Sequence, residues 1–329
     1  MARDDIRLHI VSGKGGTGKT TVAAALALAL ATNGRRTLLV EVEGRQGIAQ
    51  LFDVPPLPYT ERKIAVAPGG GDVFGLAIDT EEALLDYLDM FYNLRRAGSA
   101  LRRMGAIEFA TTIAPGLRDV LLTGKFCEAV KRTKKGVHVY DAVVVDAPPT
   151  GRVTRFLNVN REVAGIARVG PIRSQADSVM RVITSTQTAV HLVTLLEEMP
   201  VQETLDGVKA LHENGLPPGE IFVNMLRDPL MTADDLSRAS SGTLDRDVLI
   251  ADLKKGGVVA RRGATTNALV DDLADEARDH AERVALESQE RERLESLGLP
   301  VVSLPMLDQG VDLAGLYELA AVLREQGIR

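Results

Sequence analysis

The chain has 329 residues, 45% of them hydrophobic, and a formal net charge of −6. This length suffices for one large α/β domain or two small ones with a sizeable core. The acidic balance and an aromatic content of 4% without Trp argue against a nucleic-acid partner, because they provide neither a basic footprint nor a base-stacking surface.

The chain carries one cysteine, Cys127, so it cannot form an internal disulfide, and this favours a reducing compartment. No apolar run is long enough to span a bilayer. Residues 1–5 are largely charged and lead directly into an apolar run, without the hydrophobic core of a signal peptide. We therefore predict a cytoplasmic protein with no integral membrane segment.

The first predicted element is a buried strand over residues 8–11, followed by a glycine loop and an Ala- and Leu-rich helix over residues 22–31. The loop matches the phosphate-binding pattern G-x-x-x-x-G-K-T. Its glycines let backbone N–H groups turn towards phosphate oxygens, and the helix N-terminus adds its positive dipole end. The residues predicted to bind nucleotide here are Gly13, Lys14, Gly15, Gly16, Thr17, Gly18, Lys19, Thr20 and Thr21.

Two side chains of this loop have specific predicted roles with ATP or ADP. Lys19 would neutralise charge on the β- and γ-phosphates, and the hydroxyl of Thr20 would bind Mg²⁺.

Short β-branched runs recur after this helix and alternate with helical segments. Further strands are predicted at residues 37–42, 73–78, 142–145, 189–194, 220–224 and 301–304. Such alternation is typical of an α/β fold, here a P-loop NTPase with a mostly parallel central sheet flanked by helices. The Pro- and Gly-rich stretch 55–71 is expected to be a loop, and the apolar helix at 313–323 is expected to dock on the core.

Three helix-rich stretches interrupt this alternation, at about residues 81–135, 158–188 and 231–297. In the third, residues 237–242 read as a turn and residues 268–297 as one long charged helix with an apolar stripe. We interpret the stretches as excursions that form a helical cap subdomain, so that residues 1–329 make a single P-loop ATPase domain.

The strand at residues 143–145 ends in Asp146, which is the Walker B pattern. Ligands of open parallel sheets bind at the carboxyl ends of the strands, so Asp146 should lie close to the glycine loop. We predict that Asp146 binds the Mg²⁺ shell through water, near Thr20.

Lys14 directly follows the first glycine of the loop, and this arrangement resembles the deviant Walker A loop of the MinD, ParA, nitrogenase iron protein and ArsA superfamily. In that superfamily the extra lysine reaches across a dimer to the partner's nucleotide. The resemblance therefore implies a nucleotide-gated dimer in which Lys14 and Lys19 both serve catalysis.

The segment from Asp146 to Leu157 resembles the switch II signature of the ArsA/guided-entry family, which includes arsenical-pump ATPases and ATPases that deliver tail-anchored membrane proteins. The matching positions are Asp146, Pro149, Thr150, Gly151, Thr154 (shifted by one), Arg155 and Leu157. Arg152 replaces the family's His. Residues 195–204 resemble a second family segment, Pro-Glu-x-Met-x-Val-x-Glu-Thr.

The same resemblance suggests residues for water activation and for base binding. Glu43 stands where the family's switch I carries the Asp that orients the attacking water, and we predict this role for Glu43, with Glu41 in support. Asn224, at the end of a predicted strand, matches the Asn that holds the adenine edge. Pro305 and Met306 lie where the family closes the adenine pocket.

Missing cysteines exclude several branches of the superfamily. Cys127 alone cannot supply the cysteine cluster of arsenic-binding members, the zinc-binding Cys-x-x-Cys of eukaryotic guided-entry ATPases or the ligands of an iron–sulfur cluster. We therefore expect neither zinc nor an iron–sulfur cluster, and dimerisation through other contacts. The five histidines are scattered along the chain and are interpreted as packing or surface residues.

These features favour an ATP-hydrolysing dimeric switch that couples nucleotide state to a client, with a hydrophobic membrane protein as one such client. Apolar candidates for a client groove are Met90, Phe91, Leu94, Leu101 and Met104, which equally fit ordinary helix packing. One alternative is a regulatory or weakly active subunit that pairs with a paralogous ATPase instead of forming a homodimer. Another is a positioning ATPase like MinD or ParA.

Overall fold

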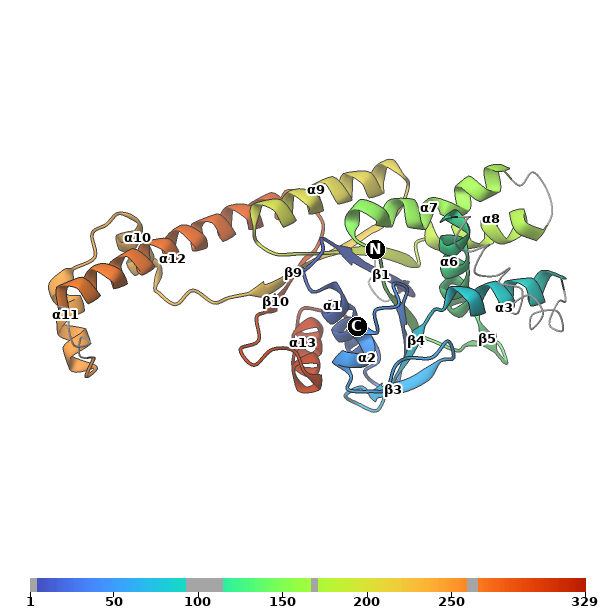
Figure 1. The fold of residues 1–329 in the computed structure, drawn as a ribbon, viewed down its shortest axis with the longest axis horizontal. Coiled ribbons are helices and arrows are strands. Elements are labelled where there is room, and N and C mark those ends of the chain that lie inside the picture. The colour runs from blue at the N-terminus through green and yellow to red at the C-terminus, as the bar shows by residue number, and fades with distance from the viewer. Residues whose placement is uncertain (1–4, 93–114, 167–170, 259–265) are drawn as a thin grey trace.

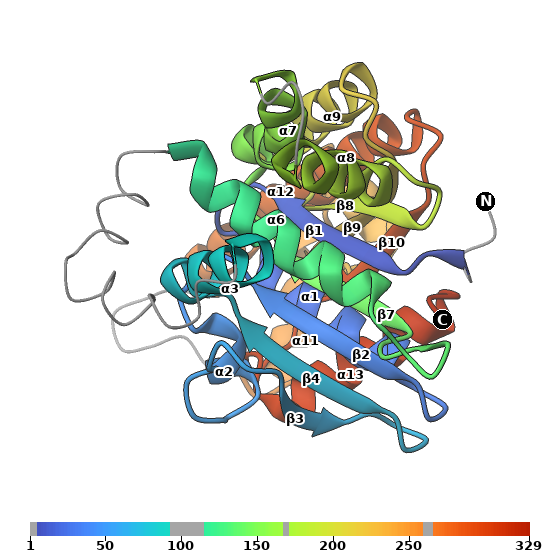
Figure 2. The same ribbon diagram turned by 90° about the vertical axis from the view of Figure 1, so that its right-hand side faces the viewer.

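The computed structural model describes residues 5–92, 115–166, 171–258 and 266–329. Within them, an eight-stranded sheet with the order β10-β9-β8-β1-β7-β2-β4-β3 forms the centre of the molecule (Figures 1 and 2). The strands are β1 (Leu8–Gly13), β2 (Arg36–Glu41), β3 (Arg62–Val66), β4 (Asp72–Ala77), β7 (Ala142–Asp146), β8 (Thr188–Thr194), β9 (Pro218–Leu226) and β10 (Val301–Pro305). All neighbouring pairs are parallel except β3 with β4. The predicted α/β class with a mostly parallel sheet is confirmed.

The edge strand β3 corrects the expectation of a loop throughout residues 55–71. Its sequence begins with the charged pair Arg62 and Lys63, and its side chains are at most half-buried, so the apolar run that marks the inner strands is missing. Pairing with β4 and an ion pair between Lys63 and Asp72, at 2.6 Å, hold it in place. A separate hairpin of β5 (Thr133–Lys134) and β6 (Val137–His138) was not predicted either.

Helices cover both faces of the sheet. On one face α1 (Lys19–Leu30), α2 (Gly47–Leu51) and α13 (Leu313–Glu325) bury an Ala- and Leu-rich core. On the other face lie α3 (Thr80–Tyr92), α6 (Pro115–Lys131), α7 (Thr150–Ile166), α8 (Pro171–Ile183) and α9 (Glu198–Glu213). The last helix, α13, packs directly on α1, as expected for a docked helix.

The third excursion forms an arm that leaves the sheet (Figure 1, left). It consists of α10 (Ala233–Ser240), α11 (Arg246–Lys255) and the 30-residue helix α12 (Thr266–Glu295). Leu294 near the end of α12 is buried against β9 and α9, whereas the start of α12 packs with α10 and α11. The turn predicted at residues 237–242 is wrong in part, because α10 continues to Ser240 after an N-cap by Thr232.

Two of the histidines form a buried polar cluster with one carboxylate, which sequence reasoning did not anticipate. His9 Nδ1 lies 3.0 Å from His191 Nε2, and His191 Nδ1 lies 2.6 Å from Glu220 Oε2. His9 is 5% exposed, and its Nε2 has no hydrogen-bond partner among the described residues. Burial, followed by the neighbouring His191, lowers the pKa of His9 to about 3, although Glu220 acts in the opposite direction.

The client-groove prediction falls mostly outside the described part of the chain. Leu94, Leu101 and Met104 lie in residues 93–114, and the side chains of Met90 and Phe91 are likewise not described. None of the helices in the described ranges is long and apolar enough to cross a membrane.

Candidate functional site

The glycine loop lies between β1 and α1, at the edge of the sheet where the parallel strands end. β1 is hydrogen-bonded to β7 on one side and to β8 on the other, and β7 is followed by β2. The ends of these central strands therefore meet around the loop (Figure 2). This is the edge at which open parallel sheets bind ligands, and the predicted context of strand, loop and helix is present.

Two glycines of the loop have no room for a side chain. Gly13 has a φ of 152°, and a Cβ atom there would lie 2.2 Å from the carbonyl oxygen of Val193 in β8. Gly18 has a φ of 84°, and its Cβ would lie 2.3 Å from the amide nitrogen of Asn224. The loop backbone is thus pressed against two neighbouring strands, which fixes the direction of its N–H groups.

The two loop lysines have different partners. Lys19 Nζ donates to the carbonyl oxygen of Lys14 at 3.3 Å, so this side chain folds back along the loop. Lys14 Nζ instead forms an ion pair with Glu203 Oε1 of α9 at 3.0 Å, and both side chains are about one-third exposed, 31% and 38%. The lysine that sequence resemblance assigns to a dimer partner is therefore at the surface and is paired within its own chain.

Thr20, Asp146 and Glu41 form the candidate Mg²⁺ site. The Thr20 hydroxyl donates to Asp146 Oδ2 at 2.7 Å, and Glu41 at the end of β2 is in register with Asp146 at the end of β7. Burial, opposed by the Thr20 hydrogen bond and Lys19, raises the pKa of Asp146 to about 6, and Glu41 and Glu43 add to the rise.

These residues fit a divalent cation. Glu41 is only 2% exposed, and its Oε1 atom has no hydrogen-bond partner among the described residues. A hydroxyl and buried carboxylate oxygens are the hard ligands that Mg²⁺ prefers. A cation there would balance carboxylates that are otherwise poorly compensated.

Glu43, the predicted water-orienting residue, lies just beyond β2. Its side chain is 24% exposed and forms an ion pair with Arg45 at 3.5 Å. It is close enough to Asp146 to influence its pKa.

The predicted base-binding residues come together beside the loop. Asn224 is 4% exposed and donates through Nδ2 to the carbonyl oxygen of Thr17 at 2.9 Å. Pro305 is in register with Leu226, two residues after Asn224, and the backbone N–H of Met306 donates to Leu226 at 2.8 Å. Among the described residues, one amide hydrogen and the amide oxygen of Asn224 have no hydrogen-bond partner.

Exposed apolar side chains surround this amide. Met225 and Met306 are 43% and 42% exposed, and both line a cavity of about 230 Å³ together with Leu286 of α12. Met225 has a positive φ of 56°, a conformation that bulky side chains rarely adopt and that is concentrated at functional sites. A flat apolar base would cover these methionines.

Comparison of the sequence with known proteins identifies a family. A family model described as anion-transporting ATPase, of the ArsA type, matches residues 6–186. The chain belongs to this anion-transporting ATPase family. The resemblance predicted from residues 13–20 and 146–157 is confirmed, and family membership implies nucleotide binding.

Relatives of the family cover different shares of the chain. The ATPase BagA of Mycobacterium tuberculosis is 54% identical over 325 residues, which cover 98% of this chain and 94% of BagA. The arsenical pump-driving ATPase of Acidiphilium multivorum is 25% identical over 326 residues, covering 93% of this chain and 53% of that protein. The ATPase GET3 of Kluyveromyces lactis is 29% identical over 181 residues, covering 50% of this chain and 51% of GET3.

The structure of this family member adds contacts that sequence reasoning missed. The Ser12 hydroxyl donates to the carbonyl oxygen of Pro148 at 2.7 Å, which ties the glycine loop to the switch II segment. Arg118 at the start of α6 donates to the carbonyl oxygen of Val42 at 3.4 Å, beside Glu43. Burial raises the pKa of the neighbouring Asp119, and the charges of Arg152, Arg118 and Arg155 offset only part of this rise. No local sequence signal marks these contacts, because they join distant segments.

Proposed function

We propose that this chain binds ATP with Mg²⁺, hydrolyses it and acts as a dimeric, nucleotide-dependent switch. The observation that carries the proposal is the 2.7 Å hydrogen bond between the Thr20 hydroxyl and Asp146. It brings the end of the glycine loop to the acidic end of β7, as ATP hydrolysis by P-loop proteins requires.

Each residue of the site has a proposed task. The loop N–H groups and the N-terminus of α1 hold the phosphates, and Lys19 swings from the Lys14 carbonyl to neutralise them. Thr20 and Asp146 hold Mg²⁺, with Asp146 acting through water and Glu41 beside it. When bound, Mg²⁺ supplies charge neutralisation on the transferred phosphoryl group. Glu43 orients the water that attacks the γ-phosphorus, so that ADP and phosphate leave.

The dimeric part of the proposal depends on Lys14. In the superfamily that the loop resembles, this lysine reaches a partner's nucleotide, and here it forms a partly exposed ion pair with Glu203. A surface pair of this kind contributes about 0.2–1 kcal/mol, so exchange to a nucleotide phosphate is energetically accessible. The partner would be a second copy or a paralogous ATPase, and the client a hydrophobic membrane protein.

The test is a phosphate-release assay with saturating ATP and Mg²⁺, with EDTA in parallel. The variants are Lys14→Ala, Lys19→Ala, Asp146→Asn and Glu43→Gln, and the matched control is Lys209→Ala, which changes an exposed lysine of α9. ATP binding is measured separately by calorimetry, and mass by light scattering with and without ATP.

We expect Lys19→Ala and Asp146→Asn to lose roughly a hundredfold or more in rate, because each removes a charge from the phosphates or their Mg²⁺. Glu43→Gln should bind ATP but hydrolyse it slowly, and Lys14→Ala should prevent ATP-dependent dimerisation. The proposal fails if the wild-type protein neither binds nor hydrolyses ATP, or if Lys19→Ala behaves like Lys209→Ala.

A further inference from the structure

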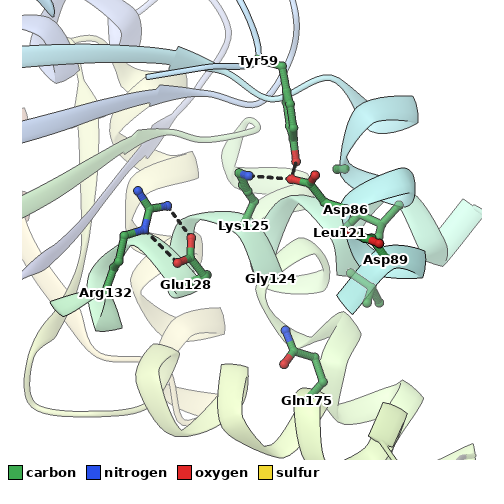
Figure 3. Close-up of a pocket in the computed structure, with 11 residues that line it drawn as sticks. Tyr59, Asp86, Asp89, Leu121, Gly124, Lys125, Glu128, Arg132 and Gln175 are labelled. Carbon is green, nitrogen blue, oxygen red and sulfur yellow. Dashed lines mark hydrogen bonds and ion pairs between the residues drawn. The ribbon is translucent and has the colours of Figure 1, made fainter. Parts of the chain in front are cut away.

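A second cavity, of about 430 Å³, opens on the helical face of the sheet, away from the glycine loop. Figure 3 shows that α3, α6 and α8 surround it, with Tyr59 at its upper rim. Ala83, Val120 and Leu121 give it an apolar wall. The volume lies within the range of about 300–1,000 Å³ that small-molecule sites occupy. None of the roles proposed above uses this cavity.

The two cations among the described residues of the cavity wall, Lys125 and Arg132, are already paired. Lys125 Nζ lies 2.8 Å from Asp86 Oδ2 and 4.5 Å from the centre of the Tyr59 ring. Arg132 contacts Glu128 through two of its nitrogens and Glu61 at 2.6 Å. A ligand with a carboxylate or phosphate would have to break one of these pairs, so the wall is poorly suited to anions.

The cavity wall also contains hydrogen-bond acceptors that receive no hydrogen bond from the described residues. Tyr59 and Lys125 both donate to the same oxygen of Asp86, Oδ2, which leaves Oδ1 without a hydrogen-bond partner among the described residues. Asp89, one turn further along α3, and Gln175 on α8 have no partner among the described residues. Burial opposes ionisation of Asp86, but the hydrogen bonds from Lys125 and Tyr59 outweigh it and lower its pKa.

The balance of charge in the wall also favours a cationic over an anionic ligand. Among the described lining residues, three carboxylates (Asp86, Asp89 and Glu128) face two cations (Lys125 and Arg132), so this part of the lining carries one excess negative charge. Glu61 shares the same Arg132 and increases the excess. Asp86 and Asp89 are three residues apart on α3, so their side chains lie on one face of the helix.

From this cavity we infer a binding site for a small organic cation, a primary amine carried on an apolar body. The ammonium group has three N–H donors, which match the free oxygens of Asp86, Asp89 and Gln175. The apolar body would cover Ala83, Val120 and Leu121.

The test compares three probes with the same six-carbon chain and different head groups: hexylamine, hexanol and hexanoate. Calorimetric titration of the full chain is done at neutral pH in buffer of low ionic strength, where an ammonium–carboxylate pair is least screened. Hexylamine should bind saturably and about tenfold more tightly than either of the other probes, a difference of about 1.4 kcal/mol.

Variants then locate the binding. Asp89→Asn should weaken hexylamine binding about three- to tenfold and leave hexanol binding unchanged. Asp177→Asn, which changes an exposed acid of α8 outside the cavity, should change neither affinity. Gly124→Leu should block the cavity, because a Cβ at Gly124 meets only Gln175, at 3.6 Å, and a longer side chain would extend into the open space. Thermal melts verify that each variant is folded.

Several results would overturn the inference. They are the lack of saturable hexylamine binding by the folded wild-type protein, hexanoate binding as tightly as hexylamine, and equal effects of Asp89→Asn and Asp177→Asn. Should Gly124→Leu not fold, the comparison of the two Asp→Asn variants still decides the question.

Discussion

Lowering the pH from 7 to 5 should destabilise this protein through His9. The pKa of His9 is lowered to about 3 in the folded state, chiefly by burial and then by His191. In the unfolded state its pKa is about 6.5, so between these values the unfolded chain binds more protons than the folded one. The stabilisation that comes from keeping His9 neutral is therefore fully present above about pH 6.5 and is lost progressively as the pH falls below this value.

The expected loss follows from the difference between the two pKa values. At pH 5 the unfolded His9 is protonated and the folded one is not, which lowers the free energy of unfolding by about 2 kcal/mol relative to pH 7. Glu220, whose pKa the His191 contact lowers to about 2 against the cost of burial, adds only about 0.2 kcal/mol at this pH and more below pH 4.5.

The assay is urea unfolding at pH 7 and pH 5 for the wild type and for His9→Gln. The wild type should lose about 2 kcal/mol more than His9→Gln between the two pH values, because the variant lacks the imidazole that burial keeps neutral in the folded state. His212→Gln, which changes an exposed histidine of α9, should behave like the wild type. Equal pH dependence in the wild type and His9→Gln would refute the reasoning.

Three further predictions concern the glycine loop. Gly13→Ala should abolish ATP binding and lower the free energy of unfolding by more than about 2 kcal/mol, because its Cβ would clash with Val193. Gly15→Ala should fold normally, because nothing lies within 4 Å of its Cβ. Thermal melts and ATP titrations compare the two variants. Asn224→Ala should weaken ATP binding about tenfold. It should also lower the free energy of unfolding by about 1–2 kcal/mol, because it leaves the buried carbonyl oxygen of Thr17 unpaired. Unchanged ATP affinity would contradict the base-binding role proposed for Asn224. Glu203→Gln should release Lys14 and raise the dimer fraction at subsaturating ATP in light scattering, and a lowered fraction would assign Glu203 to the dimer contact instead.

The strands and the glycine loop could be predicted because their signals are local. The central strands β1, β7 and β8 consist mostly of apolar residues, interrupted at His9 and His191, because strands covered by helices on both faces are buried on both sides. The edge strand β3 has only one neighbour and carries Arg62 and Lys63, so its sequence resembles a loop. The end of α10 was predicted as a turn because it contains Ser and Gly, which favour turns. In the structure, contact with α12 stabilises the helix there.

The partners of the site residues could not be predicted, because they depend on contacts between distant segments. His9 and His191 are separated by 182 positions and meet only because β1 pairs with β8. Lys14 was assigned to a dimer partner from resemblance alone, and its ion pair with Glu203 depends on where α9 crosses the loop. Asn224 was predicted as a base ligand, which stays a prediction, and its hydrogen bond to Thr17 shows a contact that supports the loop.

Helix α6 joins the two sites discussed above. Its first turns carry Arg118, which donates to the carbonyl oxygen of Val42 beside the candidate water-orienting Glu43, and Asp119, which faces the switch II arginines. Its next turns carry Gly124 and Lys125, which line the cavity of about 430 Å³ that we propose binds an amine. Because a helix moves largely as a rigid body, a shift of the switch segments on ATP binding would displace the cavity wall. Linkage then requires that an amine which binds one nucleotide state more tightly changes the affinity for ATP by the same factor.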